Sequence, residues 1–228
     1  RNGSGKTMLL RAICGLIFPD SGKVIIDGKQ LHKDISFPES CGIIIENTDL
    51  LPNFSAFDNL KMLSEIKNTA NDNMIKSAIK SVGLDPDSKK KVKTFSLGMK
   101  QRLSIAQALF EDPDILLLDE PTNYLDVEHI EWLKRYLNDY ENAFILISHD
   151  IPFLNSVVNL IYHMDNKKLD RYVGDYDKFM EVYEMKKAQL EAAYNKQQQE
   201  IKELKDFVAR NKARVATRNM AMSRQKKL

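Results

Sequence analysis

Two adjacent carboxylates, Asp119 and Glu120, follow the uninterrupted apolar run 115–118. Such a run without alternation predicts a parallel strand that is buried on both faces. Carboxylates at the end of a buried strand are costly unless they serve an ion or a reaction. We expect Asp119 to hold Mg²⁺ through water, and Glu120 to polarise the water that attacks a γ-phosphate in line. A strand that simply exits into solvent is the structural alternative.

A second set of candidate residues opens the chain. Residues 1–7 match the end of a G-x-x-x-x-G-K-[ST] loop, whose first glycine would lie before residue 1. Successive backbone N–H groups of such a loop curl around phosphate oxygens, and its lysine reaches the β- and γ-phosphates. The residues predicted to bind the nucleotide here are Asn2, Gly3, Ser4, Gly5, Lys6 and Thr7, and the Thr7 hydroxyl is also predicted to ligate Mg²⁺. A Gly/Ser-rich turn before a helix is the alternative.

A third candidate, His149, follows the apolar run 143–147. Ligands of parallel α/β sheets bind at the carboxyl ends of the strands, so we expect His149 to meet the same phosphates. There it would hold the γ-phosphate and the attacking water. The three other histidines have no such placement, and no role is assigned to them: they are His32, His129 and His163.

The elements that position these residues follow from apolar spacing. Leu9, Leu10, Ile13 and Ile17 predict a helix whose N-terminus faces the phosphates. A turn is predicted at 19–22, a strand at 24–26, and a further strand at 42–45 that runs into Glu46. Alternating strands and helices predict an α/β fold with a parallel sheet.

With these motifs in order, residues 1 to about 170 resemble the ATP-binding cassette (ABC) family of P-loop NTPases. Within 95–102, Ser96 and Gly98 fit the family's signature region, while two neighbouring residues depart from it. The resemblance implies that Ser96 and Gly98 contact ATP bound by an opposing cassette, and that Asp126 lies in the loop that crosses this dimer seam. Glu46 stands where the family has a glutamine that senses Mg²⁺ and water, so it joins Glu120 and His149 as a catalytic candidate.

The resemblance implies an ABC cassette over 1–172 without its first strands, followed by a helical arm over 173–228. The strand that leads into the phosphate loop, and the aromatic residue that stacks on adenine, would precede residue 1. We therefore expect this stretch alone to bind ATP weakly.

The two parts of the cassette resemble different branches of the family. Residues 1 to about 110 are similar to the ATPase subunits of bacitracin and lantibiotic exporters. Residues from about 122 onward are similar to the F branch, whose members have no membrane domains and act on ribosomes. A join near 113–123, by recombination, assembly error or design, is a hypothesis.

The last part of the chain predicts a long helix with a basic tip. Residues 176–208 lack Gly and Pro, which predicts one helix of roughly 50 Å. A 4-3-4-3-4 spacing predicts a coiled-coil seam formed by Leu190, Tyr194, Gln197, Ile201, Leu204 and Val208. Residues 208–228 hold seven Lys/Arg and no Asp/Glu, in a chain with 34 basic and 32 acidic residues, so the tip is expected to meet an anion.

The family resemblance implies that this anion is ribosomal RNA and transfer RNA. A solvated basic face is one alternative, and a basic helix on a membrane surface is another.

Cysteine content and apolar run length indicate the cellular compartment of the protein. Cys14 and Cys41 lack a metal-ligand spacing and fit a reducing cytosol, and no apolar run reaches the length of a membrane span. No signal peptide is recognisable, so we expect a cytoplasmic protein that uses ATP and Mg²⁺. Three functions remain: a ribosome-associated ATPase, the ATP-binding subunit of a membrane exporter with a separate permease, and a non-catalytic fragment whose helix binds RNA.

Overall fold

The computed structural model describes residues 5–45, 50–67, 70–165, 168–211 and 222–223. The chain divides into two compact units, Arg1–Tyr172 and Val173–Leu228. These are the N-terminal and the C-terminal unit.

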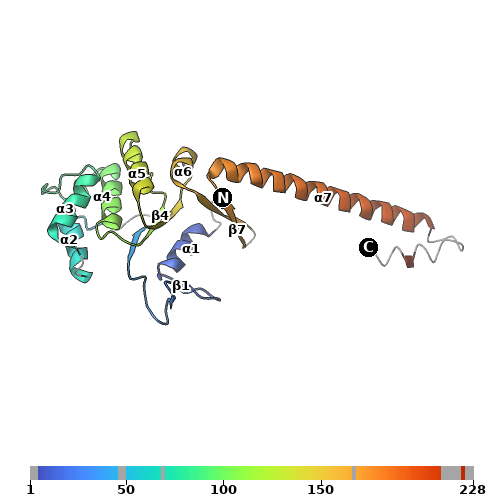
Figure 1. Cartoon of the computed structure of the whole chain (residues 1–228), viewed down its shortest axis with the longest axis horizontal. Helices are drawn as coiled ribbons and strands as arrows, with labels where there is room; N and C mark the ends of the chain where they lie inside the picture. The colour runs from blue at the N-terminus through green and yellow to red at the C-terminus, as the bar shows by residue number, and fades with distance from the viewer. Residues whose placement is uncertain (1–4, 46–49, 68–69, 166–167, 212–221, 224–228) are drawn as a thin grey trace. The chain divides into compact units, whose positions relative to one another are not determined.

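The N-terminal unit contains a three-stranded parallel sheet in the order β3–β4–β5. Its central strand, β4, is labelled in Figure 1. The strands are β3 (Cys41–Ile44), β4 (Ile115–Asp119) and β5 (Ala143–Ile147). Leu116, Leu117 and Leu118 of the central strand are at most 1% exposed. The expected parallel strand, buried on both faces, is therefore confirmed, and its burial explains why the apolar run shows no alternation.

Helices cover this sheet. They are α1 (Lys6–Ile13), α2 (Ala56–Lys67), α3 (Asp72–Ser81), α4 (Leu97–Leu109), α5 (Val127–Asp139) and α6 (Ile151–Val157), with a 3-10 turn η1 (Val92–Thr94) before α4. Leu116 and Leu118 belong to the large core cluster formed with α2 to α6, whereas Leu117 packs with Leu10 and Cys14 of the α1 region. Alternate residues of β4 thus serve the two sides of the sheet.

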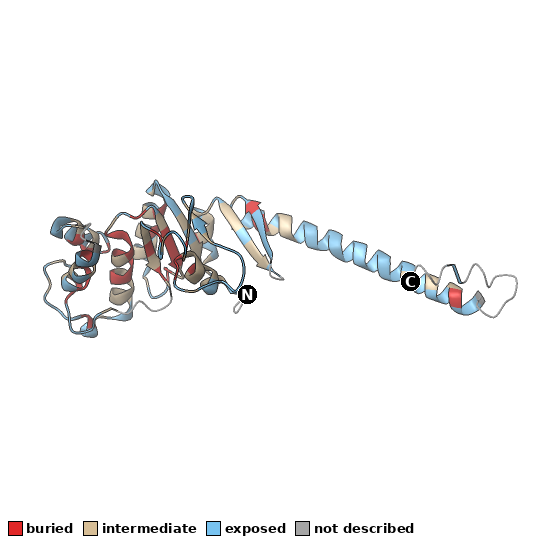
Figure 2. Ribbon diagram, turned by 90° about the horizontal axis from the view of Figure 1, so that it is seen from below, coloured by how far each residue is buried: buried red, intermediate tan, exposed pale blue. Residues whose placement is uncertain are grey.

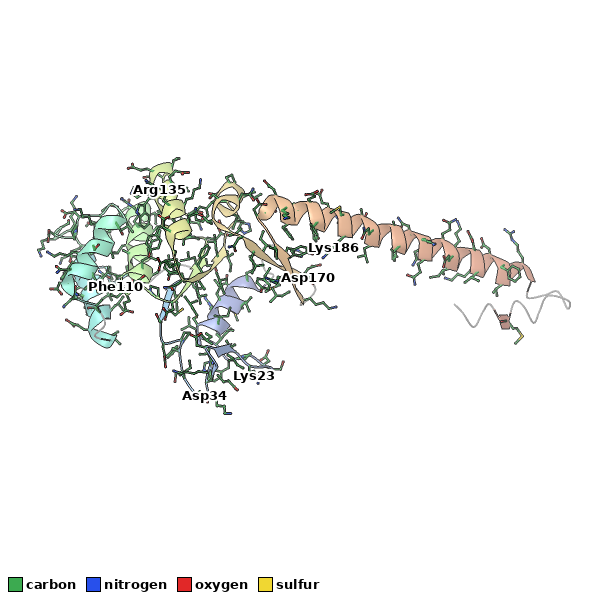
Figure 3. All side chains as sticks on the ribbon, in the orientation of Figure 1. Lys23, Asp34, Phe110, Arg135, Asp170 and Lys186 are labelled. Atoms are coloured by element: carbon green, nitrogen blue, oxygen red, sulfur yellow. The ribbon has the colours of Figure 1, made fainter. Side chains whose placement is uncertain are left out.

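Helix α5 shows how sequence pattern produces this packing. It buries Leu133 and Leu137, which lie four residues apart, while Arg135 between them is exposed (Figure 3). Residues four apart lie on the same face of a helix, so one face of α5 enters the core and the other faces water.

Helix α1 is shorter than the apolar spacing predicts: it ends at Ile13 and does not reach Ile17. Gly15 follows with φ = 79°, a left-handed conformation that ends helices and that favours glycine. A Cβ atom at Gly15 would lie 2.6 Å from the carbonyl oxygen of Ser36, so a larger residue would not fit. The prediction that included Ile17 in the helix was wrong for this reason.

Two further strand pairs lie outside the three-stranded sheet. The predicted strand at 24–26 is present as β1 (Ile25–Ile26) and pairs with β2 (Lys29–Gln30). Asp27 and Gly28 between them have φ values of 49° and 79°, as in a two-residue hairpin turn with positive φ at both positions. Strands β6 (Leu160–Asp165) and β7 (Lys168–Val173) form the other pair.

The C-terminal unit consists mainly of α7 (Tyr176–Asn211), a helix of 36 residues that confirms the predicted long helix. Asp175 caps its start by accepting a hydrogen bond from the backbone N–H of Lys178 at 3.0 Å. The helix is exposed along most of its length (Figure 2), and Leu190 and Tyr194 of the predicted seam are 73% and 59% exposed. The coiled-coil seam stays a prediction.

None of the helices in the described part of the chain combines the length and the apolarity that a bilayer crossing requires.

Candidate active site

The N-terminus of α1 and the carboxyl end of β4 meet, although they are far apart in sequence. The hydroxyl of Thr7 donates a hydrogen bond to Oδ2 of Asp119 at 2.6 Å, which joins two residues 112 positions apart. Helix α1 begins at Lys6, directly after Gly5, whose φ of 91° favours glycine. The structure therefore brings together the two residues that the sequence predicted as metal ligands, with Lys6 next to them at the start of a helix.

Glu120 lies at the point where β4 and β5 end side by side. Its backbone N–H donates to the carbonyl oxygen of Ile147 at 2.8 Å, and its φ of 49° is left-handed, which is costly for a residue with a side chain. Its Oε2 accepts a hydrogen bond from the backbone N–H of His149 at 3.2 Å. These bonds hold the Glu120 side chain at the carboxyl edge of the sheet.

The other carboxylate oxygen of Glu120 has no hydrogen-bond partner among the described residues. Oε1 is buried and accepts none from the described part of the chain, although Nε2 of His149 lies 3.5 Å away. Burying a carboxylate oxygen without a hydrogen-bond donor lowers the stability of the fold. This oxygen is therefore suited to accept a hydrogen bond from a bound water or ligand.

His149 presents its ring beside this carboxylate. Its side chain is 63% exposed, in the turn between β5 and α6. The next residue, Asp150, caps α6 by accepting from the backbone N–H of Phe153 at 3.0 Å, which fixes where the turn ends. The imidazole is thus free to reach a ligand while its backbone is held by Glu120.

Four predicted site residues lie outside the described residues: Asn2, Gly3, Ser4 and Glu46.

The signature residues Ser96 and Gly98 form the start of α4. The hydroxyl of Ser96 accepts from the backbone N–H of Met99 at 3.2 Å, so Ser96 is the N-cap of this helix. A Cβ atom at Gly98 would lie 2.7 Å from the carbonyl oxygen of Tyr124, so glycine lets α4 approach the loop before α5. Within the described part of the chain, no hydrogen bond or ion pair connects these two residues to Thr7, Asp119 or Glu120.

Asp126 is the N-cap of α5, and it has a partner that sequence reasoning missed. Its Oδ1 accepts from the backbone N–H of His129 at 3.0 Å and lies 2.5 Å from Nδ1 of the same histidine. The hydrogen bond from the His129 ring lowers the pKa of Asp126 and favours the carboxylate. The i to i+3 spacing of an N-cap and a histidine was the available signal.

The donor set of this site suits a magnesium–nucleotide complex. Mg²⁺ prefers oxygen ligands and is commonly bound by one or two protein groups together with substrate phosphates and water. Thr7 and Asp119 present a hydroxyl and a carboxylate oxygen 2.6 Å apart. The described residues contain no group of three His, Cys, Asp or Glu side chains that could hold a metal by themselves.

Comparison with known proteins gives two matches to family models. An ABC transporter family model matches residues 1–123, and a second ABC transporter model matches residues 162–228.

The alignments of this chain with curated relatives differ in length and identity. The ABC transporter ATP-binding protein YfmM of Bacillus subtilis is 71% identical over 150 residues, which are 66% of this chain and 28% of that protein. YybJ of the same organism, another ABC transporter ATP-binding protein, is 52% identical over 172 residues, which are 74% of this chain and 79% of that protein. ABC transporter F family member 4 of Dictyostelium discoideum is 37% identical over 164 residues, 70% of this chain and 14% of that protein.

Among solved structures, the dimeric ATP-binding cassette MJ0796 in a post-hydrolysis state with ADP and Pi matches with a TM-score of 0.65 at 22% identity. The match covers 76% of this chain and 82% of that one, and it supports the fold. A family model covers more than half of the chain, and the chain spans 79% of a relative that is 52% identical, so this chain belongs to the ABC transporter family, among its ATP-binding proteins.

Proposed function

We propose that this protein binds Mg-ATP and hydrolyses it, and that it does so as an F-branch ABC protein acting on the ribosome. The observation that carries the ATPase proposal is the meeting of Thr7, Asp119 and Glu120 at the carboxyl edge of the parallel sheet. The ends of parallel strands and the N-terminus of a helix are where phosphate ligands bind.

Each residue has a role in this proposal. The ammonium of Lys6 and the N-terminal N–H groups of α1 bind the phosphates, because both are positive. Thr7 and Asp119 would hold Mg²⁺, which when bound neutralises negative charge on the phosphates. Oε1 of Glu120 accepts a hydrogen bond from the attacking water and orients it, and His149 donates to the γ-phosphate. Glu46 is proposed to join them beside the water.

The Lys6→Ala variant tests the phosphate site. We expect ATP turnover to fall to background, because the positive charge next to the phosphates is lost. Lys29→Ala is a matched control, since Lys29 lies in β2 and forms an exposed ion pair with Glu39. Equal turnover by the Lys6 variant and the wild type would contradict the assignment.

A second cassette is the proposed partner across the Ser96, Gly98 and Asp126 face. The solved structures similar to this chain are described as dimeric cassettes. ATP would then bind between Lys6 and Thr7 of one cassette and Ser96 and Gly98 of the other. This second cassette belongs to the same full-length chain or to a second copy.

The ribosomal assignment draws on three observations. Relatives include F family members, a second family model matches 162–228, and α7 is a long exposed helix. The basic residues 208–228 would contact ribosomal or transfer RNA, whose phosphates attract Lys and Arg. This activity belongs in the cytoplasm.

Co-sedimentation with ribosomes tests this assignment. A Glu120→Gln variant should keep ATP bound, because the carboxamide does not polarise water as a carboxylate does. We expect this variant to enrich on ribosomes with ATP and not with ADP. Equal recovery of the variant with both nucleotides would contradict a role for ATP in ribosome binding.

The alternative function is that of an ATP-binding subunit for a membrane exporter with a separate permease. The observation that favours it is the 52% identity to YybJ, of which the chain spans 79%. Copurification of a membrane permease with the protein, together with failure to bind ribosomes, would favour this alternative.

A further inference from the structure

One histidine connects two motifs that the proposed function treats separately. The Nδ1 atom of His129 lies 2.5 Å from Oδ1 of Asp126, and its Nε2 lies 2.8 Å from Nη1 of Arg102. Arg102 belongs to α4, which begins with the signature residues, and Asp126 belongs to the loop before α5. The imidazole therefore bridges these two elements.

The partners of His129 determine where its proton lies. A guanidinium has donors only, so Nε2 beside Arg102 must act as the acceptor. Nδ1 then carries the proton and donates it to Oδ1 of Asp126. A protonated ring would place an N–H against Arg102, so the arrangement selects the neutral Nδ1–H tautomer.

The Arg102 side chain is itself held in place. Its Nη1 donates to the carbonyl oxygen of Gly83 at 3.0 Å, where the chain leaves α3. A Cβ atom at Gly83 would lie 2.9 Å from Nε2 of His129 and 3.1 Å from Nη1 of Arg102, and its φ of 70° also favours glycine. Only glycine leaves room for the bridge at this point.

The bridge leaves one oxygen of Asp126 for an outside partner. Oδ1 takes both the backbone N–H and the ring N–H of His129. The side chain of Asp126 is 69% exposed, whereas that of His129 is 18% exposed. The half-buried histidine thus lies behind a carboxylate whose second oxygen accepts no hydrogen bond from the described residues and is open to an outside donor.

We propose that His129 is a positioning residue for Asp126: with Arg102 behind it, the neutral imidazole fixes the carboxylate so that Oδ2 meets a hydrogen-bond donor on a second cassette. This inference rests on the proposed seam role of Asp126 in ATP hydrolysis. It adds that the start of α4 and the seam loop move together, because Arg102 and Asp126 bind opposite sides of one ring.

The first test is the tautomer of His129, read from the nitrogen-15 NMR spectrum of the imidazoles in the whole chain at pH 8. The His129 signals are assigned by their loss in a His129→Asn variant. We expect an Nδ1–H ring, and a change in its signals in Asp126→Ala. An Nε2–H ring in the wild type would overturn the proposal. This readout does not require ATP turnover, so it holds or fails independently of the proposed function.

Two conservative variants then separate positioning from packing. In His129→Asn the amide nitrogen can take the place of Nδ1 and still donate to Asp126. In His129→Gln the amide oxygen can take the place of Nε2 and still accept from Arg102, but the donor to Asp126 is lost. Each variant therefore keeps one half of the bridge.

We expect the asparagine variant to keep ATP turnover within about twofold of the wild type. The glutamine variant should lose roughly tenfold, as Asp126→Ala does, because a hydrogen bond to a charged group is lost. The Asp126→Ala/His129→Gln double variant should lose no more than either single variant. Thermal unfolding of the two histidine variants is the check on folding, and equal turnover of the two would overturn the proposal.

Discussion

At the scale of single residues, the site depends on Glu120, which occupies an unfavourable backbone conformation and has one buried oxygen that accepts no hydrogen bond from the described residues. Both features cost stability. A carboxylate with one oxygen held by the backbone N–H of His149, and a buried second oxygen that can still accept a hydrogen bond, is suited to orient a water. The strained backbone conformation of Glu120 is therefore consistent with a catalytic role.

Thr7 and Asp119 offer a direct test of the metal ligands. Thr7→Val keeps the size of the side chain but removes the donor to Asp119, and we expect Mg²⁺-dependent ATP binding to weaken roughly tenfold or more. The measurement is a fluorescent-nucleotide titration with and without Mg²⁺. Thr7→Ser keeps the hydroxyl and is the matched control, so equal weakening in both variants would contradict the hydroxyl's role.

His149 should affect catalysis more than stability. Its side chain is 63% exposed, so His149→Ala is expected to change the unfolding temperature little and to lower kcat about 100-fold. His163→Ala on β6 is the control. Steady-state kinetics and thermal unfolding measure these effects. A wild-type kcat in the His149 variant would contradict a catalytic role for His149.

Residue types and order were enough to predict that Thr7 would lie beside Asp119, and Glu120 beside His149, because the carboxyl ends of parallel strands share one edge. The bridge from Arg102 through His129 to Asp126 could not be predicted in this way. The bridge requires that Gly83, Arg102 and His129 lie close together in the folded chain. The spacing of these residues along the sequence does not indicate this proximity.

At the scale of elements, β4 and α7 were predictable because their patterns are continuous: an unbroken apolar run for one, and the absence of Gly and Pro for the other. The end of α1 was not, because Ile17 continues the apolar spacing beyond Gly15, where the helix has already ended. Local backbone conformation prevailed there over hydrophobic periodicity.

Helix α5 also anchors the segment that leads into β4. The hydroxyl of Tyr140, at the end of α5, donates to the carbonyl oxygen of Pro113. Burial raises the pKa of Tyr140 to about 12. We expect Tyr140→Phe to lower the free energy of unfolding by about 1 kcal/mol, because one hydrogen bond is lost.

The sign of the pH effect follows from this raised pKa. The unfolded chain releases the Tyr140 proton near its ordinary pKa of about 10, before the folded chain does. The contribution of Tyr140 to stability is therefore complete below about pH 10 and is lost as the pH rises toward 12. Denaturant unfolding between pH 8 and pH 11 should show a smaller decline in Tyr140→Phe than in the wild type. Parallel declines would contradict this effect.

At the scale of the whole molecule, two ABC transporter ATP-binding proteins of Bacillus subtilis match different lengths of the chain. The alignments to YfmM and YybJ cover 150 and 172 of the 228 residues, so they overlap in part. The hypothesis of a join near 113–123 can be checked by sequencing the source DNA across codons 100–130. Unbroken reads from one locus would exclude an assembly error.

The basic residues of the C-terminal unit make a quantitative prediction. If they bind RNA phosphates, replacing Arg210, Lys212 and Arg214 by Gln should weaken ribosome binding and reduce its salt dependence. The slope of log affinity against log salt should decrease by about 2 to 3, since each phosphate contact contributes 0.7 to 0.9. Filter binding at several salt concentrations measures this slope. An unchanged slope would show that these three residues do not contact RNA phosphates.

The most direct measurement of the ATPase proposal compares phosphate release and ATP retention in the wild type and in Glu120→Gln. We predict that the wild type releases phosphate from ATP only with Mg²⁺. The variant should retain ATP but release phosphate at least 100-fold more slowly, because it lacks the carboxylate that orients water. Phosphate release by Glu120→Gln at the wild-type rate would contradict the assignment of Glu120 and, with it, the proposed mechanism.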